Sequence, residues 1–221
     1  LGARLFRHLV ALPLSYFHLV FTIPASLRPF FLGRGRIHAF EALFTAASET
    51  ILDVAARQGL LLGVLAVLHT WNQKLDNHPH IHCLVPGGGF GRDGFVVMKR
   101  FLFSYKLLQK LRVLLKEGVL NVGRASAYQL LENADSRDWN MKVKRALAGP
   151  DAVIKYFARY TKRIGLSDSR VTAYDGKHVT YAYRDRQDGN RVKPARLEAP
   201  TFCQRFLNHV LPPGFVRIRR Y

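Results

Sequence analysis

Two neighbouring stretches decide the fold: residues 61–71, LLGVLAVLHTW, and residues 79–85, PHIHCLV. Each is a short, mostly apolar run, and the second is followed at once by a proline and three glycines, which end a regular element. Such runs are typical of buried strands. A turn near residues 74–75 would join the two as a hairpin, so the sequence predicts a sheet built around this pair.

The segments on either side alternate between strand and helix patterns. Aromatic and β-branched runs predict strands, and apolar residues at helical spacing predict helices. We expect strands over Tyr16–Ile23, Arg170–Tyr174, His178–Arg184 and Phe215–Arg219, helices over Ile37–Arg57, Ser104–Glu117, Pro150–Ile164 and Thr201–Leu211, and loops over Ser26–Gly35 and Arg186–Arg196. This order predicts an α+β fold with a mostly antiparallel sheet.

The charge of the chain points to a polyanionic partner. Lys plus Arg is 34 and Asp plus Glu is 15, so the formal charge of the 221 residues is 34 − 15 = +19. An apolar fraction of 48% excludes a disordered basic tail. Part of the charge is expected on the outer face of the helix over Ser104–Glu117. Nucleic acid is the first expected partner and an anionic membrane the second, with a merely cationic protein as the alternative.

The cysteine content and hydropathy indicate a protein of a reducing cytoplasm. Cys83 and Cys203 form neither a disulfide framework nor a Cys-x-x-Cys zinc pair. The stretches Leu60–Leu68 and Leu9–Ile23 are too short or too interrupted to span a bilayer, and no convincing signal peptide is present. Because the chain does not begin with Met, we expect that N-terminal material is missing.

His80 and His82 are candidate metal ligands. They flank Ile81, and in a strand the side chains of residues i and i+2 share a face, about 6–7 Å apart along the strand. Two imidazoles so placed can bind one metal ion. The alternative is a pair of ordinary strand histidines, because short motifs also occur by chance. His18 and His209 could belong to the same site or be structural.

A third ligand is predicted from the hairpin. With the turn near residues 74–75, His69 lies opposite His80, and cross-strand pairs share a face. Asp76 and His78 are the next candidates for the third ligand after His69. A slip of one residue would point His69 away from the site. Three nitrogen ligands suit Mn²⁺, Zn²⁺, or Mg²⁺ bridged to a phosphate.

Residues 155–163, KYFARYTKR, form a second candidate site. Tyr156 and Tyr160 are four residues apart and so share one face of a helix. The alternative is a pair of tyrosines at the edge of the core beside a solvated basic face. The outer side of this helix would carry four cations, which are the candidate DNA-binding residues: Lys155, Arg159, Lys162 and Arg163.

The two candidate sites suit one chemistry. A phenol with a pKa of about 10 is a poor nucleophile, and neighbouring cations favour its phenolate. A divalent ion stabilises the charge that develops on a phosphate under attack. Together they predict phosphoryl transfer on a nucleic-acid backbone through a phosphotyrosine, and two tyrosines would let one strand be held while a second is cut. The alternative is a non-catalytic nucleic-acid-binding module.

Five stretches in this order resemble the rolling-circle transposases of the insertion-sequence-91 family, which belong to the HUH class of single-strand DNA endonucleases: YFHLVFTIP (16–24), LAVLHTW (65–71), HPHIHCLVPGGG (78–89), YFARYTKR (156–163) and LPPGFVRIRRY (211–221). The resemblance implies a ferredoxin-like (RRM-like), mostly antiparallel sheet with helices packed on it. It also implies Mg²⁺ or Mn²⁺ on His80 and His82, and Tyr156 and Tyr160 as nucleophiles.

The implied reaction forms a 5′-phosphotyrosine on single-stranded DNA at transposon ends and releases a 3′-hydroxyl; a replication initiator or relaxase of the same chemistry is the alternative. We expect neither a membrane nor a small-molecule partner, and a nucleoid-associated protein of the bacterial cytoplasm. Residues 1–221 are expected to form one catalytic domain, with a helical insertion over about 90–148. Family members usually begin with a cysteine-rich zinc-binding region, so we expect this chain to be the core of a longer transposase.

Overall fold

The computed structural model describes residues 15–57, 59, 63–87, 101–120, 122–135, 141–147, 155, 158 and 165–221. Its contacts group the chain into two compact units. The first comprises Leu1–His69, Pro79–Thr161 and Val216–Tyr221, and the second Thr70–His78 and Lys162–Phe215. A single catalytic domain over 1–221 stays a prediction.

The first unit contains a five-stranded sheet. Its strands are β1 (Ser15–Thr22), β2 (Leu65–Trp71), β3 (Asn77–Gly87), β4 (Met141–Leu147) and β8 (Ile218–Arg220), in the order β4-β1-β3-β2-β8. The pairs β1/β3, β1/β4 and β2/β8 are antiparallel, and the short turn between β2 and β3 makes that pair a hairpin. With α2 (Arg36–Ala56), α3 (Phe101–Lys116) and α4 (Arg124–Asp135) as connections, the first four strands follow the ferredoxin-like β-α-β-β-α-β order. The expected α+β fold is confirmed.

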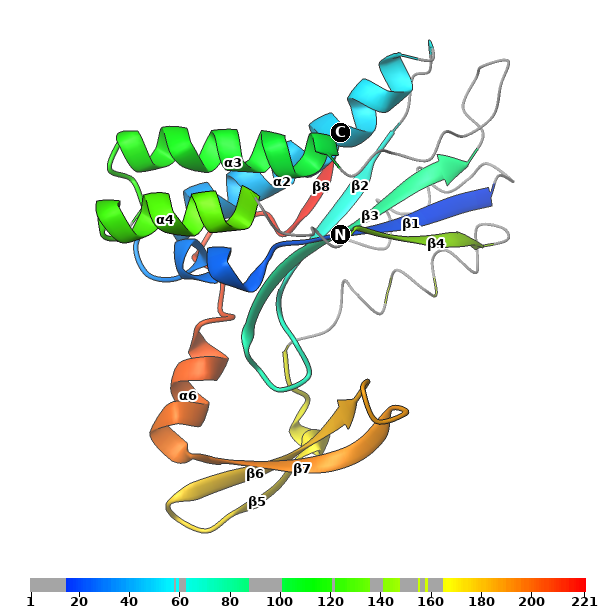
Figure 1. Ribbon diagram of the computed structural model, residues 1–221. Coiled ribbons are helices and arrows are strands. Elements are labelled where there is room, and N and C mark those ends of the chain that lie inside the picture. The colour runs from blue at the N-terminus through cyan, green and yellow to red at the C-terminus, as the bar shows by residue number, and fades with distance from the viewer. Residues whose placement is uncertain are drawn as a thin grey trace. The chain divides into compact units, whose positions relative to one another are not determined.

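One face of this sheet is apolar. Leu19 and Phe21 of β1 lie opposite Cys83 and Ile81 of β3, and all four side chains are fully buried. The three helices lie together on one side of the sheet (Figure 1) and contribute their own buried apolar stripes. The opposite face of β3 therefore carries its alternate residues, the histidines.

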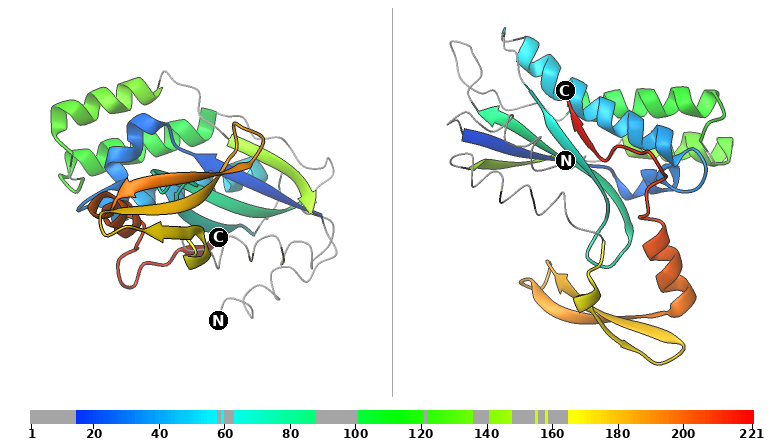
Figure 2. Two further views of the ribbon diagram at one scale, coloured as in Figure 1. Left: turned by 90° about the horizontal axis from the view of Figure 1, so that it is seen from below. Right: turned by 180° about the vertical axis from the view of Figure 1, so that it is seen from behind.

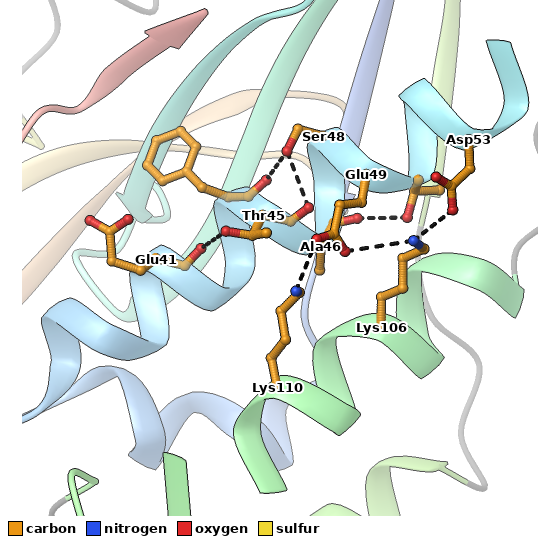
Figure 3. Close-up of polar contacts among 10 residues, drawn as sticks. Glu41, Thr45, Ala46, Ser48, Glu49, Asp53, Lys106 and Lys110 are labelled. Atoms are coloured by element: carbon orange, nitrogen blue, oxygen red, sulfur yellow. Dashed lines mark hydrogen bonds and ion pairs between the residues drawn. The ribbon is translucent and has the colours of Figure 1, made fainter. Parts of the chain in front are cut away.

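Charged side chains join α2 to α3 (Figure 3). Lys106 Nζ lies 2.6 Å from Asp53 Oδ2 and 3.6 Å from Glu49 Oε2, and Lys110 Nζ lies 3.1 Å from Glu49 Oε1. The expectation of a basic outer face on α3 is thus wrong for these two lysines, because α2 presents carboxylates to them.

The strand β8 also contacts the helix α2. The Arg219 guanidinium binds the Glu41 carboxylate through two nitrogens and lies 4.3 Å over the Phe44 ring. Backbone hydrogen bonds between Val64 and Tyr221 extend its pairing with β2. This edge strand is therefore held both by the sheet and by a helix.

The second unit is built on a three-stranded antiparallel sheet and one helix. The strands are β5 (Val171–Tyr174), β6 (His178–Asp185) and β7 (Arg191–Glu198), and the helix is α6 (Ala199–Leu207). Figure 2 gives two more views of the β6–β7 hairpin. The core of this unit consists of Leu75, Leu166 and Tyr181, with Phe202 and Phe206 packed against it.

The turn between β5 and β6 is stabilised by an aspartate, as the Asp175-Gly176 pair predicts. The backbone N–H groups of Lys177 and His178 donate to Asp175 Oδ1, and Arg196 donates to Oδ2. These donors hold the pKa of the Asp175 carboxyl far below its ordinary value. Gly176 supplies the positive φ of +87° that the turn needs.

Most expected elements that lie on described residues are confirmed, with boundaries that differ by a few residues, but the two expected loops are wrong. The expected helix over Pro150–Ile164 lies almost entirely outside the described residues. The loop over Ser26–Gly35 contains a 3₁₀ helix, η1 (Ala25–Phe31), which buries Leu27, Phe30 and Phe31. The loop over Arg186–Arg196 is a turn followed by β7. As an edge strand, β7 tolerates Pro194, which hides the strand pattern in the sequence.

The span of the expected helical insertion, about 90–148, contains a strand as well as helices. The helices α3 and α4 lie there, but Met141–Leu147 is the strand β4, paired with β1 at the sheet edge. Its apolar-basic alternation begins at Met141 and Val143 but breaks at a register shift before Leu147. This bulge interrupts the period of two by which a strand is identified.

Candidate metal centre

Three histidines gather on the polar face of the five-stranded sheet. His69 comes from β2, and His80 and His82 come from β3. One ring nitrogen of each lies within 4.8 Å of the others. The ring centroids are 5.3 Å apart for His69 and His80, 4.6 Å for His69 and His82, and 4.8 Å for His80 and His82. The three imidazoles can therefore hold one metal ion.

Strand alternation explains the positions of the two β3 histidines. Ile81 and Cys83 point into the apolar core, which leaves His80 and His82 on the other face. On β1 they lie opposite Thr22 and Val20. Burial raises the pKa of the Cys83 thiol, so this cysteine stays protonated and serves as a core residue. The group is thus made of nitrogen ligands alone.

The turn of the hairpin is held by Asn72. Its Oδ1 accepts hydrogen bonds from the backbone N–H groups of Lys74 and Asp76, and its Nδ2 donates to Asp76 Oδ2. Leu75 adopts a positive φ of +60°. This compact turn lies where the hairpin argument expects it, and the hairpin brings His69 beside the β3 pair.

Asp76 and His78, the next candidates for the third ligand, do not join the group. Asp76 lies 2.7 Å from Arg205 Nη1 and so forms an ion pair within the second unit. Within the part of the chain that the structure describes, the group of potential metal ligands consists of His69, His80 and His82, without Asp76 or His78. The sequence suggests Asp76 as a ligand because it lies close to the histidines along the chain. Spacing along the chain does not show that its carboxylate pairs with Arg205 instead.

His18 lies against the group. Its Nε2 is 2.7 Å from Nδ1 of His82, and the two rings stack with centroids 4.9 Å apart and an angle of 14° between them. His18 is 1% exposed, whereas His69 and His82 are each 6% exposed and His80 is half-buried. His18 thus adds a fourth imidazole, which contacts His82, next to the three that could bind metal.

His209 is not part of this group. Its Nε2 donates to the Leu75 carbonyl over 3.0 Å, and its Nδ1 lies 3.1 Å from the Thr70 hydroxyl. Both contacts lie within the second unit, where they join the end of α6 to the hairpin turn. Of the two additional histidines singled out in the sequence, one therefore contacts the group and the other is structural.

The tyrosine segment, residues 155–163, lies almost entirely outside the described residues. Lys155 and Ala158 are described, both are helical, and Lys155 is exposed. The other candidates of this segment, Tyr156, Arg159, Tyr160, Lys162 and Arg163, are not among them. Their roles stay predictions.

Comparison with known proteins places the chain in a family. The family model Y2_Tnp, described as "Putative transposase", matches residues 63–221, which include β2, β3 and the tyrosine segment. The chain is 34% identical to the "Putative transposase y4qJ" of Sinorhizobium fredii over 97% of its own length and 60% of that protein. It is 28% identical to the "Transposase for insertion sequence element IS801" of Pseudomonas savastanoi pv. phaseolicola over 92% of its own length and 52% of that protein.

The chain thus spans between half and two thirds of the length of these two relatives. No solved structure matches it. Within the described residues, no helix has the length and hydropathy needed to cross a membrane. Because the family model covers well over half of the chain, including the hairpin that carries the three histidines, this protein belongs to the Y2_Tnp family of transposases.

Proposed function

We propose that this chain cleaves and rejoins single-stranded DNA at transposon ends, in rolling-circle transposition, through a 5′-phosphotyrosine. In this proposal His69, His80 and His82 hold Mg²⁺ or Mn²⁺, and Tyr156 and Tyr160 are the nucleophiles. The observation that supports it most directly is the convergence of three imidazole nitrogens within 4.8 Å, in a chain of a transposase family.

The histidine group suits a substrate-facing metal centre. His69 and His82 are buried, so their rings are held by packing, while His80 is partly exposed. Protein ligands confined to one side of an ion leave its other side for phosphate oxygens. A bound divalent ion would polarise the scissile phosphate.

The chain's own residues would carry out the transfer. The phenolic oxygen of Tyr156 or Tyr160 attacks phosphorus after losing its proton, and the bond from phosphorus to the 3′-oxygen breaks. The 3′-oxygen takes a proton and leaves as a hydroxyl. The phosphodiester is exchanged for a phosphotyrosine, so the reverse attack by a 3′-hydroxyl can rejoin DNA. Lys155, Arg159, Lys162 and Arg163 would hold the strand and favour the phenolate.

A covalent-adduct assay tests this proposal. The chain is mixed with labelled single-stranded DNA that carries transposon-end sequence and with Mn²⁺ or Mg²⁺, and the products are run on a denaturing gel. We expect a protein–DNA adduct in the wild type and none in the double variant Tyr156→Phe/Tyr160→Phe. An adduct in the double variant would show that the nucleophile lies elsewhere.

The metal role needs its own variant. His80→Ala is expected to abolish the adduct but to keep most single-strand binding, because phosphate contacts supply that affinity. Circular dichroism and a melting curve establish that each variant is folded. If folded wild-type protein forms no adduct with either ion, or if His80→Ala cleaves normally, the proposed chemistry is wrong.

A further inference from the structure

His18 has a position that its sequence context does not explain. It lies on β1, 64 residues before His82, yet its Nε2 is 2.7 Å from Nδ1 of His82. The contact is buried, and the planes of the two rings are nearly parallel, with an angle of 14° between them. In the register of β1, the cross-strand partners of His18 are Leu84 and Lys144, so its place in the sheet brings it no carboxylate from those positions.

The hydrogen bond ties the proton positions of the two rings together. A neutral imidazole carries one proton, so one ring must donate and the other accept. If His82 donates from Nδ1, its Nε2 bears a lone pair and can bind metal. If His18 donates from Nε2 instead, the proton of neutral His82 sits on its Nε2, and that nitrogen cannot be a ligand.

We infer that His18 is a positioning residue that accepts a hydrogen bond from His82 Nδ1 and thereby presents the Nε2 lone pair of His82 to a divalent cation. Metal-binding histidines usually donate their second ring nitrogen to such an acceptor, most often a carboxylate or a carbonyl. Here the imidazole of His18 fills that place. This inference rests on the metal site of the proposed function.

Metal affinity, measured by calorimetry with Mn²⁺ on the full chain, tests the inference without any turnover. His18→Leu removes the acceptor and is expected to weaken Mn²⁺ binding by about 10–100-fold, the usual effect of losing such a partner. His18→Gln keeps an acceptor oxygen and is expected to restore most of that loss. Val20→Ala is the matched control, since Val20 lies directly opposite His82 and makes no part of the hydrogen bond.

Several outcomes would overturn the inference. Equal affinity of wild type and His18→Leu removes any role for His18, and equal losses in the Leu and Gln variants reduce that role to packing. If the wild type binds Mn²⁺ while His18 proves dispensable, the proposed function stands and only the inference fails. If the wild type binds no Mn²⁺, the metal site itself is wrong and the inference falls with it.

A second measurement keeps the inference testable if His18→Leu does not fold. Nitrogen NMR of the imidazoles in the metal-free wild type reports the tautomer of each ring. We expect a protonated Nδ1 and an unprotonated Nε2 at His82, assigned by comparison with His82→Gln. The opposite tautomer would overturn the inference.

Discussion

Gly35, the residue before α2, combines a left-handed backbone conformation with a close backbone contact, and only glycine fits both. Its φ is +81°, in the left-handed region, and a Cβ placed there would lie 1.9 Å from the carbonyl oxygen of Val119. The backbone between η1 and α2 therefore touches the backbone after α3. This close approach depends on the missing side chain.

Gly35→Ala is expected to lower the free energy of unfolding by about 2–5 kcal/mol, because it adds left-handed strain and a backbone clash. Gly118→Ala is the matched control: its φ is +70°, but apart from its chain neighbours no heavy atom of the described residues lies within 4 Å of its added Cβ, so it bears the strain alone. Urea unfolding of both variants measures the difference. Equal losses would show that the approach to Val119 does not matter.

At the level of elements, opposite charges hold α2 and α3 in register. Glu49 lies between Lys106 and Lys110, and its side chain is 39% exposed. Partly exposed ion pairs contribute about 0.2–1 kcal/mol each. The buried apolar stripes thus supply most of the attraction, and the charges select which faces meet.

Glu49→Lys is expected to destabilise the chain by about 1 kcal/mol or slightly more, since it places a third cation beside two lysines. Adding Lys110→Glu should recover part of the loss by restoring one opposite pair. Urea unfolding at low and high salt measures both, and screening should shrink the effect. If the double variant loses as much free energy of unfolding as the two single variants together, residues 49 and 110 do not interact.

The hairpin β2–β3 and the edge strands show how far local sequence predicts elements. The mostly apolar run over 79–85 and the proline and glycines after it identify β3 within a few residues, and Ile81, Cys83 and Val85 are fully buried. The strands β4 and β7 escape prediction, since a bulge and a proline interrupt their patterns. Edge strands lie under weaker hydrophobic constraint, so their sequences carry less of the signal.

Over the whole molecule, ion pairs cannot neutralise the net charge of +19, because it remains after all 15 acidic residues are counted against the 34 Lys and Arg residues. Lys193 illustrates the paired class, with Asp185 and Asp188 each 2.9 Å away. Lys155, exposed on the tyrosine segment, is a candidate for the class that contacts phosphates. Removing a lysine of either class should therefore affect the salt dependence of DNA binding differently.

Single-stranded DNA binding is expected to weaken steeply with salt, with a slope of log K against log salt of about −0.7 per neutralised phosphate. Lys155→Gln should reduce the magnitude of that slope by about 0.7 if it contacts a phosphate. Lys193→Gln, whose amine already has two carboxylate partners, should leave the slope unchanged. Fluorescence anisotropy over a salt series measures this, and a flat response in the wild type would contradict phosphate binding.

The sequence by itself determined the α+β order, the β2–β3 hairpin and the three histidines worth comparing, because alternation and turn signals act over a few residues. It also held the motifs that led to the transposase family. Only the tertiary structure decided that His18 meets His82 and that Asp76 binds Arg205. Both contacts join residues more than 60 positions apart, and such pairings depend on sheet order and on competition among partners, which no local pattern encodes.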